Sequence, residues 1–437
     1  AELAGYLRVH DYFLPAGSID WHDLAGYTER VDSEGLGINV APLVGHAALR
    51  VAAMGMADRT PTAAELARME ALLTTALHQG AWGMSTGLIY PPGSYAATGE
   101  LISLATVLSR HNSLYTSHIR SESDSIDAAL DEAISIGTKT GVRVQVSHLK
   151  AMGSNRGRAR ELLERLASAR ASGVDVGADQ YPYSASATTL TAVVPQWAHS
   201  GGVNALFERL ADPALRSKLE SGIGIEMARR EGAAGIVVTG CRSEKNRQLS
   251  GQTVAAIAER WGCTPAEAVV RLIREEEGNV GAIFFSMAEE DVATILADPL
   301  VAVGSDGHAL NAAEDAAEPT HPRSYGTFPR VLGHYVRGER LLPLETAIHK
   351  MTSLPASRLG FTDRGLVRQG YVADLVLFDP ATIADRATYS EPHRYAIGVV
   401  HLLVGGRFVI RNGKLTGERP GRVLKKACHN SPRPLLS

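Results

Sequence analysis

Four short segments of this 437-residue sequence share one pattern, in which an apolar, β-prone stem ends in a residue that binds metal or transfers protons. The residues at or near the four ends are His118, His148, Tyr181 and Asp306. A parallel (β/α) barrel builds its active site in this way, because the carboxyl ends of its strands meet on one face. Two histidines and an aspartate on that face are typical of a metal-dependent hydrolase.

The order of segments along the chain also indicates a parallel sheet. Strand-like stems alternate with stretches of helical character, such as 62–79, where Thr62 and Glu65 form a predicted capping box. This β-then-α order implies right-handed crossovers between parallel strands. The stems with polar carboxyl ends finish at Gly45-His46, Ser85-Thr86, His118, His148, Tyr181 and Asp306. A (β/α)8 TIM-like barrel has eight strands, so we expect its first two to be missing from this sequence.

Two regions depart from this order. Residues 185–281 are rich in helix-forming residues and have no stem that ends in a metal-binding side chain. Added strands are predicted at 236–240 and, directly after this region, at 282–286. From about residue 365, short strands separated by Gly-Gly and Asn-Gly turns indicate an antiparallel element. The expected domains are a barrel at 1–364 with an insertion at about 185–281, a small β-sandwich element at 365–424 and a tail at 425–437.

Composition excludes several classes of protein. The formal net charge of -3, with 21% charged residues, argues against a nucleic-acid partner. No apolar run approaches the roughly 20 residues that span a bilayer, and residues 3–12 resemble a helix, not a signal peptide. The cysteines, Cys241, Cys263 and Cys428, are too few for a disulfide framework. We therefore expect a cytoplasmic protein that binds a small molecule and neither a membrane nor nucleic acid.

His118 and His148 are the first candidates for a metal site. They end successive stems, and neighbouring strands of a sheet lie about 4.8 Å apart, so one metal can contact both imidazoles. Imidazole is also the commonest neutral ligand of zinc-like metals. Either histidine alone would be equally consistent with a hydrogen-bonded core residue, but their matched positions favour a metal site.

Asp306 and three further residues have candidate roles around that metal. The Asp306-Gly307 pair alone is typical of a turn, but downstream of two histidines Asp306 is a candidate ligand or general base. Lys150 lies two residues after His148, on the same side of an extended chain, where it is either solvated or a cation for a substrate carboxylate. Arg323 and Tyr181 are candidates for binding the same anion.

Several longer strings are more specific than these single residues. They are Gly-Met-Ser-Thr-Gly-Leu-Ile-Tyr-Pro-Pro-Gly at 83–93, Thr-Ser-His-Ile-Arg at 116–120, Ser-His-Leu-Lys at 147–150, Asp-Gln-Tyr-Pro-Tyr at 179–183 and His-Pro-Arg at 321–323. With these strings the chain resembles the N-acyl-D-amino-acid deacylases (D-aminoacylases) of the metal-dependent amidohydrolase superfamily. The resemblance extends from about residue 1 to about residue 424.

This resemblance implies a distorted (β/α)8 barrel with a small β-sandwich. It also implies zinc-dependent hydrolysis of N-acyl-D-amino acids to a carboxylate and a free D-amino acid. His118 and His148 match the zinc-binding histidines of the family. Asp306 matches the catalytic aspartate, which can also contact a second, weaker metal. The residues that match the groups around the substrate's α-carboxylate are Lys150, Tyr181 and Arg323.

The sequence departs from the family pattern at its N-terminal end. The family has a His-x-His pair on its first barrel strand and a metal-bridging cysteine on its second, and neither is present here. We expect the sequence to be a fragment that lacks this N-terminal part. One alternative is a cyclic-amide hydrolase of the hydantoinase or dihydroorotase kind, although no stem ends in the lysine that bridges two metals there. The other alternative is a truncated, non-catalytic binding protein, which metal content would distinguish.

Overall fold

A computed structural model of the protein describes residues 20–310 and 320–427. The predicted helix at 3–12, Cys428 and most of the predicted tail lie outside these residues. None of the described helices is both long enough and apolar enough to cross a bilayer.

The centre of the molecule is a sheet of six parallel strands in the order β1-β2-β3-β4-β5-β9. The strands are β1 (Val44–Gly45), β2 (Gly83–Gly87), β3 (Leu114–His118), β4 (Arg143–Val146), β5 (Val176–Gln180) and β9 (Val301–Val303). Each coincides with one of the six predicted stems, so the prediction of a barrel-type parallel α/β fold is confirmed. Because all six strands run in the same direction, their carboxyl ends lie at the same edge of the sheet.

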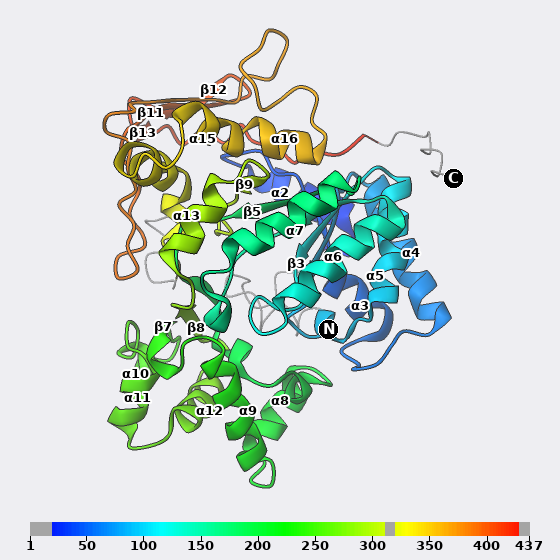
Figure 1. Ribbon diagram of the computed structural model, residues 1–437, viewed down its shortest axis with the longest axis vertical. Helices are drawn as coiled ribbons and strands as arrows, with labels where there is room; N and C mark the ends of the chain where they lie inside the picture. The colour runs from blue at the N-terminus through cyan, green and yellow to red at the C-terminus, as the bar shows by residue number, and fades with distance from the viewer. Residues whose placement is uncertain (1–19, 311–319, 428–437) are drawn as a thin grey trace.

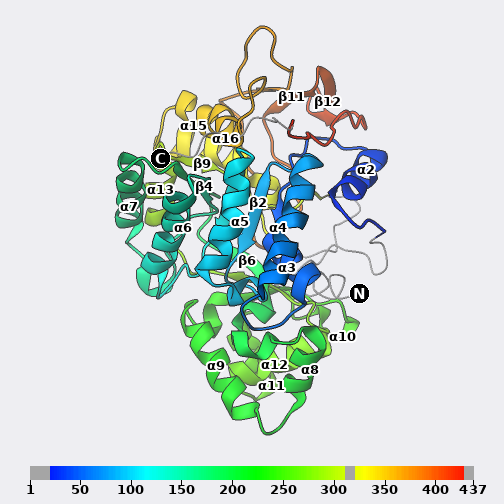
Figure 2. The ribbon, with the colours of Figure 1, turned by 90° about the vertical axis from the view of Figure 1, so that its right-hand side faces the viewer.

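Helices connect these strands and cover one face of the sheet (Figures 1 and 2). They are α3 (His46–Met54), α4 (Ala63–His78), α5 (Thr98–Arg110), α6 (Ile126–Thr140), α7 (Ala159–Ala171) and α13 (Glu289–Ala297). A further helix, α2 (Leu24–Glu34), precedes β1. The capping box of Thr62 and Glu65 at the start of α4 is present as predicted. Strand residues such as Met84, Tyr115 and Val144 are fully buried against the inner faces of the helices. This packing holds the strand ends in place.

Residues 186–284 form a second body, drawn in green below the sheet in Figure 1. Its antiparallel strands β6 (Ser186–Thr189), β8 (Gly281–Phe284) and β7 (Ile236–Gly240) pair in that order. Around them lie α8 (Val203–Ala211), α9 (Arg216–Ala228), α10 (Glu244–Arg247), α11 (Val254–Trp261) and α12 (Pro265–Glu275), with a core of their own. The two strands predicted in this region are β7 and β8, whereas β6 was not predicted.

The C-terminal part of the chain, from α14 onwards, ends in elements that lie at the opposite end of the molecule from residues 186–284 (Figure 1). Its helical segments are α14 (Arg323–Arg330), a π-helix at Val331–Gly338, α15 (Leu344–Met351) and α16 (Ser353–Leu359). The predicted antiparallel element follows, with β10 (Leu375–Phe378), β11 (Val399–Val404), β12 (Arg407–Arg411) and β13 (Lys414–Leu415) paired in chain order. The exact domain boundaries stay a prediction.

Candidate active site

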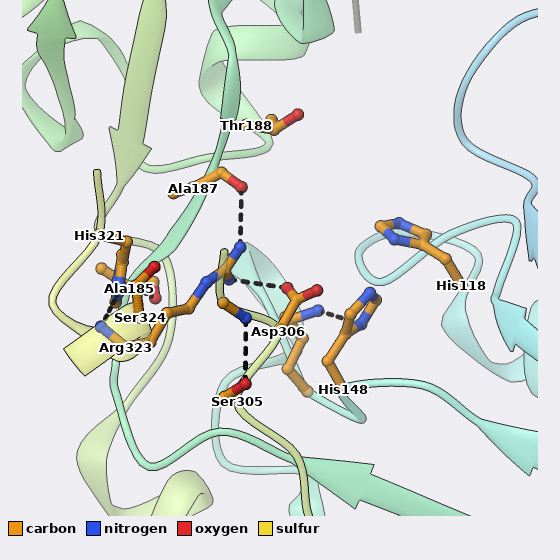
Figure 3. A network of polar contacts seen from close by, with 12 residues as sticks. His118, His148, Ala185, Ala187, Thr188, Ser305, Asp306, His321, Arg323 and Ser324 are labelled. Atoms are coloured by element: carbon orange, nitrogen blue, oxygen red, sulfur yellow. Dashed lines mark hydrogen bonds and ion pairs between the residues drawn. The ribbon is translucent and has the colours of Figure 1, made fainter. Parts of the chain in front are cut away.

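His118 and His148 lie at the carboxyl edge of the central sheet. His118 is the last residue of β3, and His148 comes two residues after β4, the strand paired with it. Their ring centroids are 4.5 Å apart with the planes nearly perpendicular, and Figure 3 shows the two rings side by side. The structure therefore brings together the two histidines that the sequence predicts as a pair.

Asp179 fixes the backbone of His148. The backbone of His148 has a φ of 38°, a left-handed conformation that a non-glycine residue adopts only when its surroundings enforce it. The backbone amide of His148 donates to Oδ1 of Asp179 over 2.8 Å, and the side-chain amide of Gln145 donates to Oδ2 over 2.9 Å. Asp179 lies on β5, beside β4, so the adjacent strand positions this imidazole.

Glu122 lies between the histidines and Lys150, and the sequence analysis missed it. Its Oε1 is 3.0 Å from Nδ1 of His148 and 2.5 Å from Nζ of Lys150, and its Oε2 is 3.7 Å from Nε2 of His118. Burial opposes ionisation of this carboxyl, but Lys150, followed by the two histidines, holds its pKa well below the usual range. An acid four residues after His118 was the only signal in the sequence.

These three side chains fit a zinc ion. One ligand atom from each of His118, Glu122 and His148 lies within 4.8 Å of the others. Nε2 of His118 is buried and has no hydrogen-bond partner in the described part of the chain. Burial lowers the pKa of His118 to about 3, which keeps the imidazole in the neutral form that binds metals. Two imidazoles and a carboxylate are also a known donor set for catalytic zinc.

Asp306 lies outside that group of three, beside Arg323. It comes three residues after β9, has a φ of 48°, and its Oδ2 is 2.8 Å from Nη1 of Arg323. In Figure 3 the carboxylate lies between Arg323 and the two histidines. Burial acts to raise its pKa, but Arg323, followed by His148 and Lys150, holds the pKa below the usual range. Asp306 is therefore an ionised carboxylate at neutral pH.

Tyr181 lies between the two cations of the site. Nζ of Lys150 is 5.5 Å from the centre of its ring, and the guanidinium of Arg323 is 4.8 Å away. The hydroxyl is buried without a hydrogen-bond partner among the described residues, and burial raises its pKa well above the usual value. A protonated hydroxyl next to two cations is a suitable donor to an anion.

His321 holds Arg323 in position. Its Nδ1 accepts a hydrogen bond from the amide of Arg323 over 3.0 Å, and its Nε2 lies 3.1 Å from the carbonyl oxygen of Ala185. Burial, followed by the nearby Arg323 charge, lowers the pKa of His321 well below its usual value, so the ring is neutral. A neutral ring protonated at Nε2 satisfies both contacts and fixes the start of α14.

All six residues predicted for the site line a single cavity of about 370 Å³, called here the first cavity. Glu122 lines it as well, and the far wall comes from the green body through residues such as Thr188 and Phe284. This volume is in the range of small-molecule sites. The residues predicted as metal ligands and those predicted as carboxylate-binding groups thus face the same space.

A comparison with protein families decides where this chain belongs. Residues 24–410 match the amidohydrolase family over most of the chain. The chain belongs to the amidohydrolase family. The predicted membership of the amidohydrolase superfamily is therefore confirmed.

Three related proteins show which members of the amidohydrolase family this chain is similar to. The N-acyl-D-glutamate deacylase of Alcaligenes xylosoxydans xylosoxydans is 39% identical over 416 residues, which are 95% of this chain and 75% of that protein. The D-aminoacylase of the same organism is 38% identical over 413 residues, 94% of this chain and 75% of that protein. The crystal structure of N-acyl-D-glutamate deacylase from Bordetella bronchiseptica, complexed with zinc and a phosphonate inhibitor that mimics the tetrahedral intermediate, matches with a TM-score of 0.77 at 40% identity. That match covers 92% of this chain and 75% of that one.

Proposed function

We propose that this amidohydrolase is a zinc-dependent enzyme that removes the acyl group from N-acyl-D-amino acids, giving a carboxylate and a free D-amino acid. The observation that carries the proposal is the first cavity, where two strand-end histidines, Glu122 and an ionised Asp306 lie together. Relatives that are 38% and 39% identical over nearly the whole chain are deacylases of this kind. The zinc and phosphonate complex of a relative supports both the metal and the reaction.

The residues of the site have separate roles in amide hydrolysis. Zinc held by His118, His148 and Glu122 would polarise the scissile carbonyl and make water more acidic. Asp306 accepts the proton of the attacking water and delivers it to the leaving nitrogen, which must be protonated to depart as an amine. Arg323 keeps Asp306 ionised before the reaction, because it holds the pKa of that carboxyl down.

Lys150, Tyr181 and Arg323 orient the substrate. The hydroxyl of Tyr181 has no partner among the described residues, and both cations lie against its ring. A substrate α-carboxylate placed there accepts charge-assisted hydrogen bonds, which are shorter and stronger than neutral ones. With the carboxylate and the scissile carbonyl both fixed, only one enantiomer presents its acyl group to Asp306 and the metal.

The test is hydrolysis of paired enantiomers by the full chain loaded with zinc. We expect amine release from N-acetyl-D-methionine but not from N-acetyl-L-methionine, with loss of activity after chelation and recovery when zinc is restored. Zinc-loaded, folded protein that hydrolyses neither enantiomer would instead support the non-catalytic alternative. Hydrolysis of a hydantoin in preference to the linear amide would support the cyclic-amide alternative.

The carboxylate-binding role predicts a substrate-dependent effect of Arg323→Gln. One charge-assisted hydrogen bond contributes about 1.5–3 kcal/mol, so kcat/KM for an N-acyl-D-amino acid should fall by about 10- to 150-fold more than for its α-amide. Comparison of the two substrates is needed because Arg323 also pairs with Asp306, and loss of that pair affects both substrates alike. Equal losses of kcat/KM for the acid and the amide would mean that Arg323 acts only through its ion pair with Asp306 and does not bind the substrate carboxylate.

A further inference from the structure

Arg230 is a cation of the first cavity that the proposed reaction does not use. The carboxylates and cations that line this cavity are Glu122, Lys150, Arg230, Asp306 and Arg323. Lys150 is paired with Glu122, and Arg323 is paired with Asp306. Arg230 also lines a neighbouring second cavity of about 260 Å³, and the carboxylate that contacts it, from Glu226, lines that second cavity and not the first. Within the lining of the first cavity, Arg230 is therefore a positive charge without a matching carboxylate.

The hydrogen bonds of Arg230 leave half of its guanidinium available. Nη1 donates to the carbonyl oxygen and to Oε2 of Glu226, both over 2.9 Å. In the part of the chain that the structure describes, the other two guanidinium nitrogens have no hydrogen-bond partner. Nε and Nη2 form the planar fork that binds a carboxylate through two parallel bonds. Glu226 thus anchors one side of the group, while the side chain is only 11% exposed.

Arg230 and Arg323 lie against the same small sheet. The guanidinium of Arg230 is 5.7 Å from the ring centre of Phe284 on β8, and Phe284 pairs with Ser186 on β6. Nη2 of Arg323 donates to the carbonyl oxygen of Ala187, the next residue of β6, as Figure 3 shows. A ligand held by Arg323 through one carboxylate can therefore extend along this wall towards Arg230.

We propose that Arg230 binds a second carboxylate of the substrate, so that this amidohydrolase prefers dicarboxylic N-acyl-D-amino acids. This inference rests on the proposed deacylase function. The second carboxylate has two possible sources, the side chain of the amino acid or the far end of a dicarboxylic acyl group. Both offer the same chemistry to the free edge of the guanidinium, and two pairs of substrates separate them.

The experiment measures kcat/KM of the zinc-loaded full chain for substrates that differ only in the second carboxylate. N-acetyl-D-glutamate is compared with N-acetyl-D-glutamine, and N-succinyl-D-glutamine is compared with N-succinamoyl-D-glutamine, in which an amide replaces the terminal carboxylate of the acyl group. We expect the acid to be preferred in one pair, and Arg230→Gln to reduce that preference by about 10- to 150-fold, the range for one charge-assisted bond. Arg230→Lys should restore part of the preference because it keeps the charge. The substrate pair in which Arg230→Gln lowers the preference for the acid identifies the source of the second carboxylate.

Arg229 provides the matched control. It is the adjacent arginine, contacts Glu226 as Arg230 does, pairs with Asp124 and lines only the second cavity. Arg229→Gln should therefore leave the preference unchanged. Wild-type protein with no preference in either pair would overturn the role of Arg230, and so would an equal loss in the Arg229 variant. Failure to hydrolyse any of these substrates would count against the proposed deacylase function itself.

Discussion

Replacing either His118 or His148 with alanine is expected to strip zinc from the protein and abolish hydrolysis of N-acyl-D-amino acids. Each change removes one imidazole from a group whose three ligand atoms lie within 4.8 Å of one another. The remaining histidine and Glu122 are too few for the three protein ligands typical of catalytic zinc. A Lewis acid contributes several kcal/mol to the transition state, so the rate should fall on the order of 10³-fold or more.

Metal analysis of the purified variants checks this result independently of activity. His334→Ala is a suitable control, because His334 lies on the π-helix, is partly exposed, and does not line the first cavity. It should bind as much zinc as the wild-type protein. Full zinc occupancy in the variant lacking both His118 and His148 would exclude the pair as ligands and with it the metal centre proposed here.

The carboxyl ends of the central strands were predictable because each follows a continuous buried stem. Residues 301–303, Val-Ala-Val, for instance, are fully or almost fully buried, and such apolar runs identify strands of a parallel sheet. Strand β6 was missed for the opposite reason. Its sequence, Ser-Ala-Thr-Thr, is short and mostly polar, and it forms a strand because β8 pairs with it. Its location depends on a partner almost one hundred residues away.

The contacts between site residues were less predictable than their positions. Glu122 lies in a loop after β3, and its place between His118 and His148 results from the packing of that loop over the strand ends. The pairing of Lys150 with Glu122, and of Arg323 with Asp306, likewise joins residues far apart in the sequence. Spacing along one strand indicates which side a residue faces, but it does not identify the partner contributed by another loop.

Asp306→Asn is expected to reduce kcat by about 10²- to 10⁴-fold, the usual contribution of a general acid or base. Asparagine has nearly the same shape but cannot accept the proton of the attacking water. The backbone should be preserved, because asparagine tolerates the left-handed conformation that Asp306 adopts with a φ of 48°. Zinc should also be retained, since Asp306 is not one of the three side chains that group around the metal position.

Kinetic constants and metal content together decide whether Asp306 transfers the proton. The matched control is Asp385→Asn, because Asp385 is another carboxylate that faces an arginine, Arg330, but it lies outside the lining of the first cavity. It should keep kcat near the wild-type value. A loss confined to KM in Asp306→Asn would assign the residue to substrate binding, and a loss of zinc would make it a ligand. Only a fall in kcat with zinc still bound agrees with proton transfer, because that step begins after substrate and metal are in place.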